Sequence, residues 1–214
     1  MSGRHLFLVR MDVAHDHEAE FNAVYDGEHV PALAGVPGVK RASRHRNAAP
    51  TYPRYHAAYE VDDLAIIDGD AWKKAGAVGR WATQIRPHTM NRHLTTYEWV
   101  GASPELTLKT PYIFWAMMDV EPHREALFNE LYDSEHVPLL CKLPGCVNVV
   151  RYRAVKATGT PGEPRYLAAY EVDRLDLPMS QLWNGTSDIG RWKPEVRPYT
   201  HNKRFIVTER LSPR

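Results

Sequence analysis

The alternation of hydrophobic and polar positions predicts two β-α-β-β-α-β units along the chain. Residues 5–13 form a mostly apolar run rich in β-favouring side chains, which is typical of a largely buried strand. Apolar residues at Phe21, Val24 and Tyr25 then recur at helical spacing within residues 16–34. The other predicted elements of the first unit are strands at 39–46 and 55–61, a helix at 63 to about 81, and a strand at 85 to about 99.

The second half of the chain repeats this order and many of its residues. The frame F-N-x-x-Y-D-x-E-H-V-P occurs at residues 21–31 and again at residues 128–138, an offset of 107. Four extra residues around 157–162 then change the offset to 111. The predicted elements of the second unit lie at 112–120, 122–142, 146–154, 165–172, about 176–192 and about 196–208. A repeat of this length indicates a duplicated domain, so we expect repeats at residues 1–101 and 102–214.

The order of elements predicts how the two repeats pack. Strand, helix, strand, strand, helix, strand is the split βαβ, or ferredoxin-like, arrangement. Such a sheet has helices on one face only, so its other face needs a cover. Two copies in one chain can cover each other, sheet on sheet. We therefore predict the α+β class, with two ferredoxin-like βαββαβ repeats that form a dimeric α+β barrel within one chain.

The repeated residues also resemble a known family. Y-D-x-E-H-V-P, the P-G pair after it, an R-x-R strand and P-R-Y-x-A-A-Y-E-V are similar to the dimeric α+β barrel superfamily, and within it to small EthD-like proteins. One departure is Leu167, which stands where the first repeat has His56. The matching residues of the first repeat are 25–31, 37–38, 44–46 and 53–61, each with a second-repeat equivalent.

This resemblance implies a range of activities. The superfamily includes cofactor-free monooxygenases, lactone isomerases, polyketide cyclases, dehydratases and decarboxylases. It also includes haem proteins of the chlorite dismutase and dye-decolourising peroxidase types. Fold is therefore implied more sharply than chemistry.

The composition limits the classes of partner that we expect for this protein. Lys and Arg number 27 against 26 Asp and Glu, so the charge balance predicts neither nucleic acid nor an anionic membrane as partner. The only cysteines, Cys141 and Cys146, are too few for a structural zinc site and are expected to be reduced. The apolar run at residues 6–9 is too short for a signal peptide or a membrane span, so we expect a cytoplasmic protein.

The repeated helix motif holds the first candidate site. Asp26 lies three residues before His29, and Tyr25 lies four before it, so all three share one helix surface. An aspartate beside a histidine can orient the ring and raise its basicity, as in a general acid–base site. Asp133, His136 and Tyr132 are the second-repeat equivalents. A purely structural role, in which Glu28 and His29 fix the turn at Pro31, is the alternative.

Two further groups are candidates for binding a substrate. Arg44 and Arg46 lie on one face of a strand and could hold a carboxylate or phenolate, as could Arg151 and Arg153. Pairing with Glu60 or Asp62, and with Glu171 or Asp173, across each hairpin is the alternative. The other group is Trp81 and Asn91, with their second-repeat equivalents Trp192 and Asn202. They belong to a set of Trp, Arg, Pro, Thr and Asn residues that recur at equivalent positions in both repeats. Metal and nucleotide motifs are absent from the sequence, so we expect no metal site.

These residues lead to one expected function and three alternatives. Because proton transfer is what the named side chains offer, we expect an acid–base enzyme that uses no cofactor, of lyase or isomerase type. Its reaction would be dehydration, decarboxylation, cyclisation or isomerisation of a small aromatic, polyketide-like or lactone substrate. The alternatives are a cofactor-free monooxygenase, a haem-binding barrel, and a barrel that binds a small molecule without turnover. The sequence leaves open whether the chain forms a homodimer.

Overall fold

The apolar run near the start of the chain forms strand β1 (His5–Val13), which is buried on both faces. Leu6 and Leu8 point to one apolar cluster, in the interior of a barrel, whereas Phe7 and Val9 belong to another, under the helices. Enclosure on both sides explains why this strand is a continuous apolar run and not an alternation.

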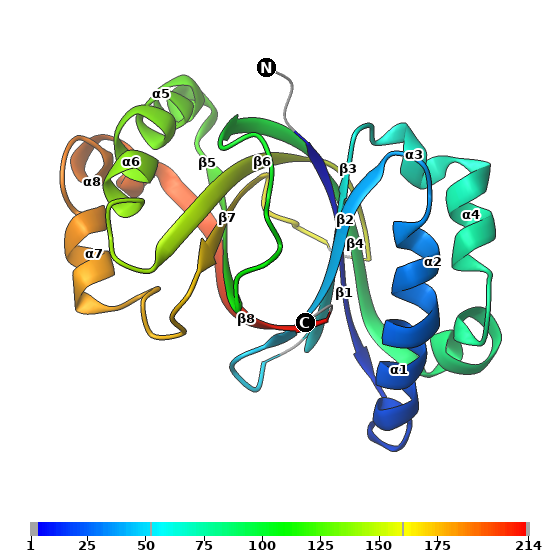
Figure 1. Ribbon diagram of the computed structural model, residues 1–214. Helices are drawn as coiled ribbons and strands as arrows, with labels where there is room; N and C mark the ends of the chain where they lie inside the picture. Colours follow the sequence, from blue (N-terminus) through cyan, green and yellow to red (C-terminus); the bar gives the residue numbers. More distant parts are fainter. Residues whose placement is uncertain (1–3, 52, 160, 213–214) are drawn as a thin grey trace.

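Eight antiparallel strands form a closed barrel in the order β1-β3-β2-β8-β5-β7-β6-β4 (Figure 1). The structure is a computed structural model that describes residues 4–51, 53–159 and 161–212. The mixed α+β class and the closed barrel confirm the predicted fold in this coarse form. The other strands are β2 (Val39–Asn47), β3 (Tyr55–Val61), β4 (Thr89–Ala102), β5 (Tyr112–Val120), β6 (Cys146–Thr158), β7 (Tyr166–Val172) and β8 (Thr200–Ser212).

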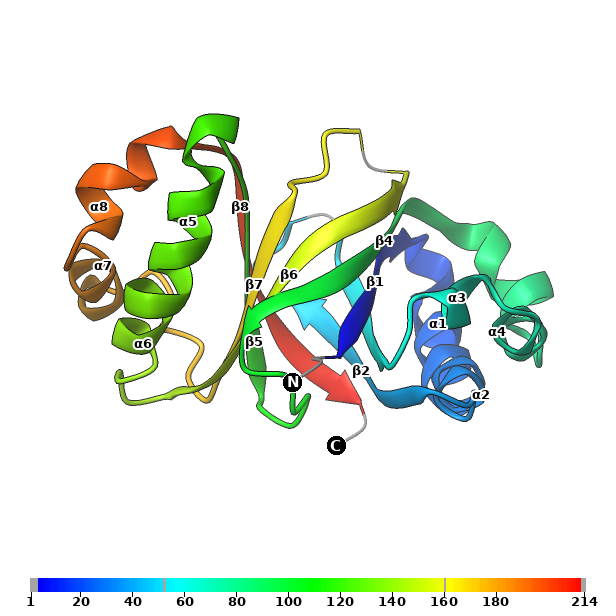
Figure 2. The ribbon, with the colours of Figure 1, turned by 90° about the horizontal axis from the view of Figure 1, so that it is seen from above.

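The two halves of the chain share this barrel because each half extends its last strand to the other. β4 pairs with β1 of its own half and with β6 of the second half (Figure 2). β8 likewise pairs with β5 and, across the barrel seam, with β2 of the first half. The barrel is therefore closed by two equivalent seams, β4–β6 and β2–β8.

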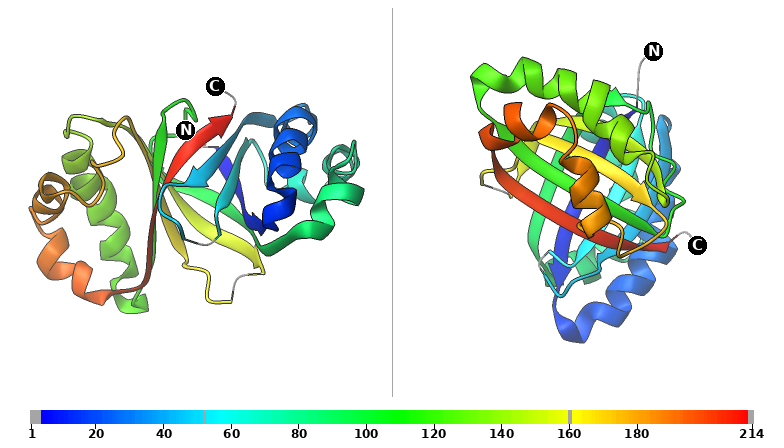
Figure 3. Two further views of the ribbon diagram at one scale, coloured as in Figure 1. Left: turned by 90° about the horizontal axis from the view of Figure 1, so that it is seen from below. Right: turned by 90° about the vertical axis from the view of Figure 1, so that its left-hand side faces the viewer.

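Helices cover the barrel on two opposite sides, with α1–α4 on one side and α5–α8 on the other (Figures 1 and 3). The helices are shorter than predicted, since each predicted helix is divided into pieces. They are α1 (Glu18–Val24), α2 (Val30–Ala34), α3 (Ala65–Asp68), α4 (Asp70–Gly76), α5 (Glu125–Leu131), α6 (Val137–Leu140), α7 (Gln181–Ser187) and α8 (Trp192–Glu195).

A π-helical turn divides the first helix of each half at the repeated motif. These turns are Tyr25–His29 and Tyr132–His136. In the first of them, the backbone N–H of Val30 donates to the carbonyl five residues earlier. Pro31 follows and has no N–H to donate, so the wider turn accommodates the missing helical bond. The sequence predicted a break near His29, and the structure places it there.

Three apolar clusters form the core. Two lie between the barrel wall and its covering helices, one in each half, and the third fills the barrel interior around Trp115, Tyr97 and Tyr152. The barrel interior also contains a buried ion pair, in which Arg10 donates to Glu163. Glu163 follows the four extra residues of the second half, so the insertion places a charge in the interior.

Candidate functional site

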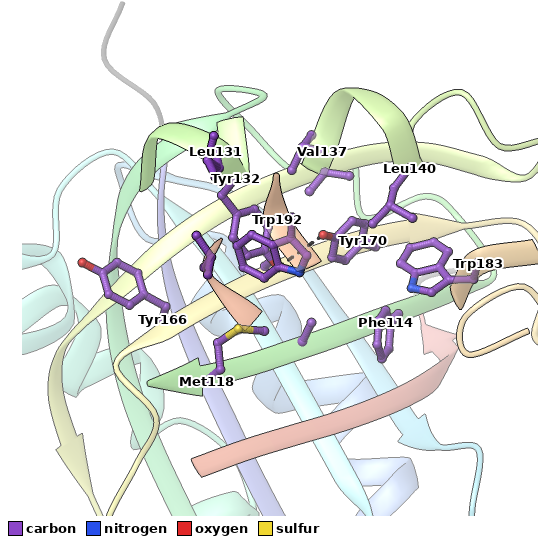
Figure 4. Packing of buried hydrophobic residues seen from close by; sticks show 14 of the residues in the cluster. Phe114, Met118, Leu131, Tyr132, Val137, Leu140, Tyr166, Tyr170, Trp183 and Trp192 are labelled. Atoms are coloured by element: carbon purple, nitrogen blue, oxygen red, sulfur yellow. Dashed lines mark hydrogen bonds between the residues drawn. The ribbon is translucent and has the colours of Figure 1, made fainter. Parts of the chain in front are cut away.

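Two cavities lie between the barrel wall and the covering helices, one in each half. The first cavity, in the first half, has a volume of about 280 Å³, and the second cavity has about 240 Å³. Their walls correspond at the repeat offsets: Tyr25 with Tyr132, His29 with His136, Tyr59 with Tyr170, Trp72 with Trp183, Trp81 with Trp192, and Arg86 with Arg197. Figure 4 shows the second half, where Tyr132, Tyr170, Trp183 and Trp192 gather above Phe114 on the barrel wall.

The motif histidine of each half packs against the wall of its cavity. The His136 ring stacks on Trp192, with centroids 4.4 Å apart, and meets Tyr132 edge to face at 5.0 Å. Tyr170 donates a hydrogen bond to the Tyr132 hydroxyl at 3.3 Å. The first half repeats the stack, with His29 on Trp81 at 4.5 Å. The structure therefore brings the motif histidine and tyrosine of each half together with the repeated tryptophan.

Burial keeps both histidines neutral. It lowers the pKa of His29 to about 4, with help from the charges of Arg92 and Arg44. It lowers the pKa of His136 to about 3, with help from Arg197 and Arg151. A general base works best with a pKa near the operating pH, so both imidazoles are weak bases here.

The predicted pairing of aspartate with histidine is replaced by an ion pair with arginine. Asp26 forms an ion pair with Arg44 at 2.8 Å, while Nδ1 of His29 is buried without a hydrogen-bond partner. Asp133 forms an ion pair with Arg151 at 2.9 Å in the second half. The aspartates therefore anchor the helix to the barrel wall, since Arg44 and Arg151 are buried in strands β2 and β6.

These buried arginines bind groups of the helix above them. Arg44 donates to the Asn22 side chain at 2.8 Å, and its guanidinium lies 4.6 Å from the Tyr25 ring centroid. Arg151 makes the same contacts with Asn129, at 2.7 Å, and with Tyr132. Both guanidinium groups are thus engaged by the protein itself.

Arg46 and Arg153 lie at the barrel seams. Arg46 pairs with Glu209 of β8 at 3.2 Å, and Arg153 pairs with Glu98 of β4. The alternative interpretation expected these arginines to pair with acidic residues across their own hairpin, and it was wrong for Arg46 and Arg153. The partner strand comes from the other half of the chain, which the sequence pattern alone did not reveal.

Asn91 and Asn202 also have structural bonds. Asn91 donates to Asp12 at 2.7 Å, and Asn202 donates to Asp119 at 2.8 Å. Both asparagines have positive φ, 49° and 47°, a conformation that asparagine tolerates better than most residues. Their repetition in both halves is explained by this turn at the start of β4 and β8.

The glutamate of the repeated motif, Glu28 in the first half, binds the second helical segment. Its carboxylate accepts from the backbone N–H of Arg80 and from Arg80 Nε, each at 2.8 Å. Gly79 has φ +71° there, and a side chain at this glycine would collide with Glu28. Glu135 binds the Arg191 backbone N–H equivalently, at 2.9 Å. The motif therefore joins the two helical segments that frame each cavity.

Cations line both cavities. Arg86 and Arg197 belong to the repeated set of Trp, Arg, Pro, Thr and Asn, whereas Lys73 and Arg92 in the first cavity and Lys203 in the second were not predicted. The signal was available, because Arg92 and Lys203 correspond at the offset of 111 and follow the repeated asparagine directly. Partial burial, together with the charge of Arg197, lowers the pKa of Lys203.

No group of three or more His, Cys, Asp or Glu side chains in the described part of the chain is arranged to hold a metal ion. No helix among these residues is long and apolar enough to cross a membrane.

Comparison with known proteins gives likeness only at the level of structure. No family model and no curated protein sequence matches the chain. An anthrone oxidase-like protein superposes with a TM-score of 0.66 at 11% identity, covering 100% of this chain and 93% of the other. A proposed monooxygenase from Fusobacterium nucleatum subsp. nucleatum gives 0.65 at 13% identity, covering 99% and 94%. A mutant chlorite dismutase from Candidatus Nitrospira defluvii, in complex with cyanide, gives 0.64 at 12% identity, covering 99% and 92%.

These likenesses correct two expectations. The expected lyase or isomerase is wrong, because the similar structures are monooxygenase-like proteins and chlorite dismutases. The expected absence of a cofactor is contradicted by the same chlorite dismutases, which are of the haem type. The weak basicity of His29 and His136 gives a physical reason for the first correction.

The residues around the second cavity do not fit haem. Pockets for drug-sized ligands measure roughly 300–1,000 Å³, and this cavity of about 240 Å³ lies below that range. We therefore derive no step through haem. What the geometry and the likenesses establish together is the fold: the chain has the architecture of the dimeric α+β barrel proteins, closed within a single polypeptide.

Proposed function

We propose that the protein is an oxidase of the monooxygenase type, which converts an activated methylene of a small, planar aromatic ketone into a carbonyl with dioxygen. The observation that carries this proposal is the second cavity, where aromatic walls meet the neighbouring cations Arg197 and Lys203. The likeness to an anthrone oxidase-like protein and to a proposed monooxygenase supports it.

The walls suit a flat aromatic substrate. Trp183, Trp192 and Tyr170 present rings to the cavity, and Phe114 and Met118 form its floor on β5 (Figure 4). Contacts between aromatic rings contribute about 0.5–1.5 kcal/mol each beyond their buried area. A volume of about 240 Å³ admits a few fused rings but no large polyketide.

The cations promote loss of a proton from the substrate. A methylene conjugated with a carbonyl ionises to an enolate, whose oxygen carries negative charge that nearby cations stabilise. The lowered pKa of Lys203 raises the fraction of neutral amine, which can accept the methylene proton. Arg197 remains positive and is held in place by Asp188 and by the Ser187 carbonyl, to which it donates at 2.9 Å.

Dioxygen completes the reaction without another oxidant. The deprotonated carbon forms a bond to one oxygen atom of dioxygen, and protonation gives a hydroperoxide. Loss of the second methylene proton, with cleavage of the O–O bond, forms the carbonyl and releases water. One dioxygen is consumed, one of its oxygen atoms enters the product, and the other leaves as water.

Dioxygen uptake with anthrone as probe tests the proposal. We expect uptake above the rate in buffer, and a product that carries one labelled oxygen when the gas is ¹⁸O₂. Lys203→Met should lower kcat about 100-fold, the lower end for a general base. Lys142→Met, at an exposed lysine outside the cavity, is the matched control. Absence of uptake above the buffer rate, or full activity of Lys203→Met, would refute the assignment.

Absorption spectroscopy separates this proposal from haem binding. A Soret band in the purified protein, or one that forms on addition of haem and is lost in His136→Ala, would replace the proposal with a haem-binding role. Dioxygen uptake by protein without such a band would retain it.

We also propose that the chain is a tandem duplication of an EthD-like, ferredoxin-like repeat, with repeats at residues 1–101 and 102–214. The equivalent strand orders β4-β1-β3-β2 and β8-β5-β7-β6 support this. Because β4–β6 and β2–β8 join the repeats, we expect one unfolding transition in calorimetry. Two well-separated transitions would instead indicate independent domains.

A further inference from the structure

The first cavity gathers positive charge without an acidic counterpart. Lys73, Arg86 and Arg92 line it, and its walls contain no aspartate or glutamate. Among the described residues, neither Arg86 nor Arg92 forms an ion pair with a carboxylate. Burial of Arg92 is the largest cause of its lowered pKa, and the positive charge of Arg86 is the next. The two cations therefore lie close enough to repel each other.

The second cavity shows what the first one lacks. There Arg197 donates to Asp188 and to Ser187, so it has a carboxylate partner. At the offset of 111, the equivalents of Asp188 and Ser187 are Ala77 and Gly76 in the first half. The cavity-lining Asn184 is likewise replaced by Lys73. Two of these three differences, Asp188 against Ala77 and Asn184 against Lys73, therefore make the surroundings of the first cavity more positive than those of the second.

Two residues that line the first cavity, Arg92 and His29, carry buried polar atoms without hydrogen-bond partners among the described residues. Nε of Arg92 is buried and makes no hydrogen bond within the described structure, and neither does buried Nδ1 of His29. The His29 side chain is more than nine-tenths buried, and it lines the first cavity. Buried polar groups are nearly always hydrogen-bonded, so Nε–H of Arg92 lacks an acceptor in the described part of the chain, and an anionic acceptor would suit its positive charge.

We infer that the first cavity is a binding site for a small, planar organic anion, an aromatic carboxylate in chemical class. Trp72 and Trp81 supply ring contacts for the flat part of such a ligand, and Arg86 and Arg92 supply donors for its carboxylate. This site is separate from the second cavity, and it does not depend on the oxidation chemistry proposed there. The cavity volume of about 280 Å³ exceeds that of the second cavity and is large enough for two fused rings.

Titration calorimetry with 1-naphthoate, and with 1-naphthamide as its neutral counterpart, tests this site on the full chain. We expect one naphthoate per chain, an affinity that falls as salt increases, and at least tenfold weaker binding of the amide. No binding of naphthoate at millimolar concentration, or equal binding of the two probes, would overturn the inference.

The internal repeat supplies matched variants that locate the bound anion. Arg92→Met should weaken naphthoate binding at least tenfold, whereas the equivalent change Lys203→Met in the second cavity should alter it less than threefold. Ala77→Asp, at an exposed position, gives Arg86 the acid that Arg197 already has and should also weaken binding. Asp188→Ala should create a second, weaker naphthoate site. Naphthoate binding that responds to Lys203→Met but not to Arg92→Met would refute the assignment.

Discussion

The imidazole of His136 lies face to face with the indole of Trp192, with ring centroids 4.4 Å apart and 24° between the planes. His29 and Trp81 repeat this stack at 4.5 Å and 28°. In each half the motif histidine thus joins the first covering helix to the second helical segment, beside the cavity. A stacked and buried imidazole is favourable only while it is neutral, which links the fold to pH.

Acid should unfold the protein well above the pH at which carboxylates titrate. Burial holds the pKa of His29 at about 4 and of His45, His56 and His136 at about 3, against an ordinary 6.5. Between those values and 6.5 the unfolded chain binds more protons, so the free energy of unfolding falls as pH falls below 6.5. At pH 5 each histidine removes about 2 kcal/mol, together about 8 kcal/mol, against a typical stability of about 5–15 kcal/mol. Denaturant titrations at about pH 7.5, 6 and 5 measure this loss.

The repeat supplies a control for the acid effect. His56→Leu introduces the residue that the second half carries at Leu167, also in the core of the barrel. It should reduce the slope of unfolding free energy against pH, between about pH 4 and 6, by about 1.4 kcal/mol per pH unit. An unchanged slope would show that His56 is not held neutral by the fold.

Arg44 and Arg46 should differ sharply in their effect on stability, although they lie two residues apart on β2. The Arg44 side chain is 1% exposed and bonded to Asp26 and Asn22, whereas that of Arg46 is 42% exposed. Arg44→Met should lower the free energy of unfolding by about 2–4 kcal/mol, because it removes a buried guanidinium together with its ion pair to Asp26 and its hydrogen bond to Asn22. Arg46→Met should cost no more than about 1 kcal/mol. Equal losses in urea unfolding would contradict this account.

The repeat made the architecture predictable from sequence. Motif spacing located the strands, the hairpin insertion and the helix break at Pro31, because these depend on local pattern and backbone chemistry. It did not reveal that Arg46 and Arg153 bind strands of the opposite half, since pairing between distant strands leaves no local signal. The divided second helix, α3 and α4, also departs from the continuous helix predicted at 63–81.

The candidate site was predicted only in part. Helical spacing places Tyr25 and His29 on one face, whereas Trp81 reaches them from the second helical segment through packing. The roles assigned to Asp26 and Arg44 were not predictable, since helix spacing alone allows Asp26 to reach either histidine or a strand below. Only the packed structure shows that the strand supplies the partner.

Gly79 should be intolerant of a side chain, unlike its neighbour Gly76. Gly79 has φ +71°, and an added methyl group would overlap the Glu28 carboxylate. Gly79→Ala should therefore lower the free energy of unfolding by about 1–3 kcal/mol. Gly76→Ala, in α4 with only Leu33 at 3.9 Å, should be neutral or stabilising by up to about 1 kcal/mol. Thermal unfolding of both variants tests the contrast, which fails if both lose stability alike.

Glu163 should be required to neutralise the barrel interior. Its carboxylate, 3% exposed, accepts from Arg10 and from the Tyr97 hydroxyl at 2.7 Å. Glu163→Gln keeps the shape but leaves Arg10 without a counter-charge, so it should lower the free energy of unfolding by about 3–5 kcal/mol. Adding Arg10→Met should recover part of that loss, since neither position of this pair then carries a charge. Glu98→Gln, which breaks the exposed seam pair, should cost about 1 kcal/mol or less. Strictly additive losses in the double variant would mean that Glu163 and Arg10 do not compensate each other.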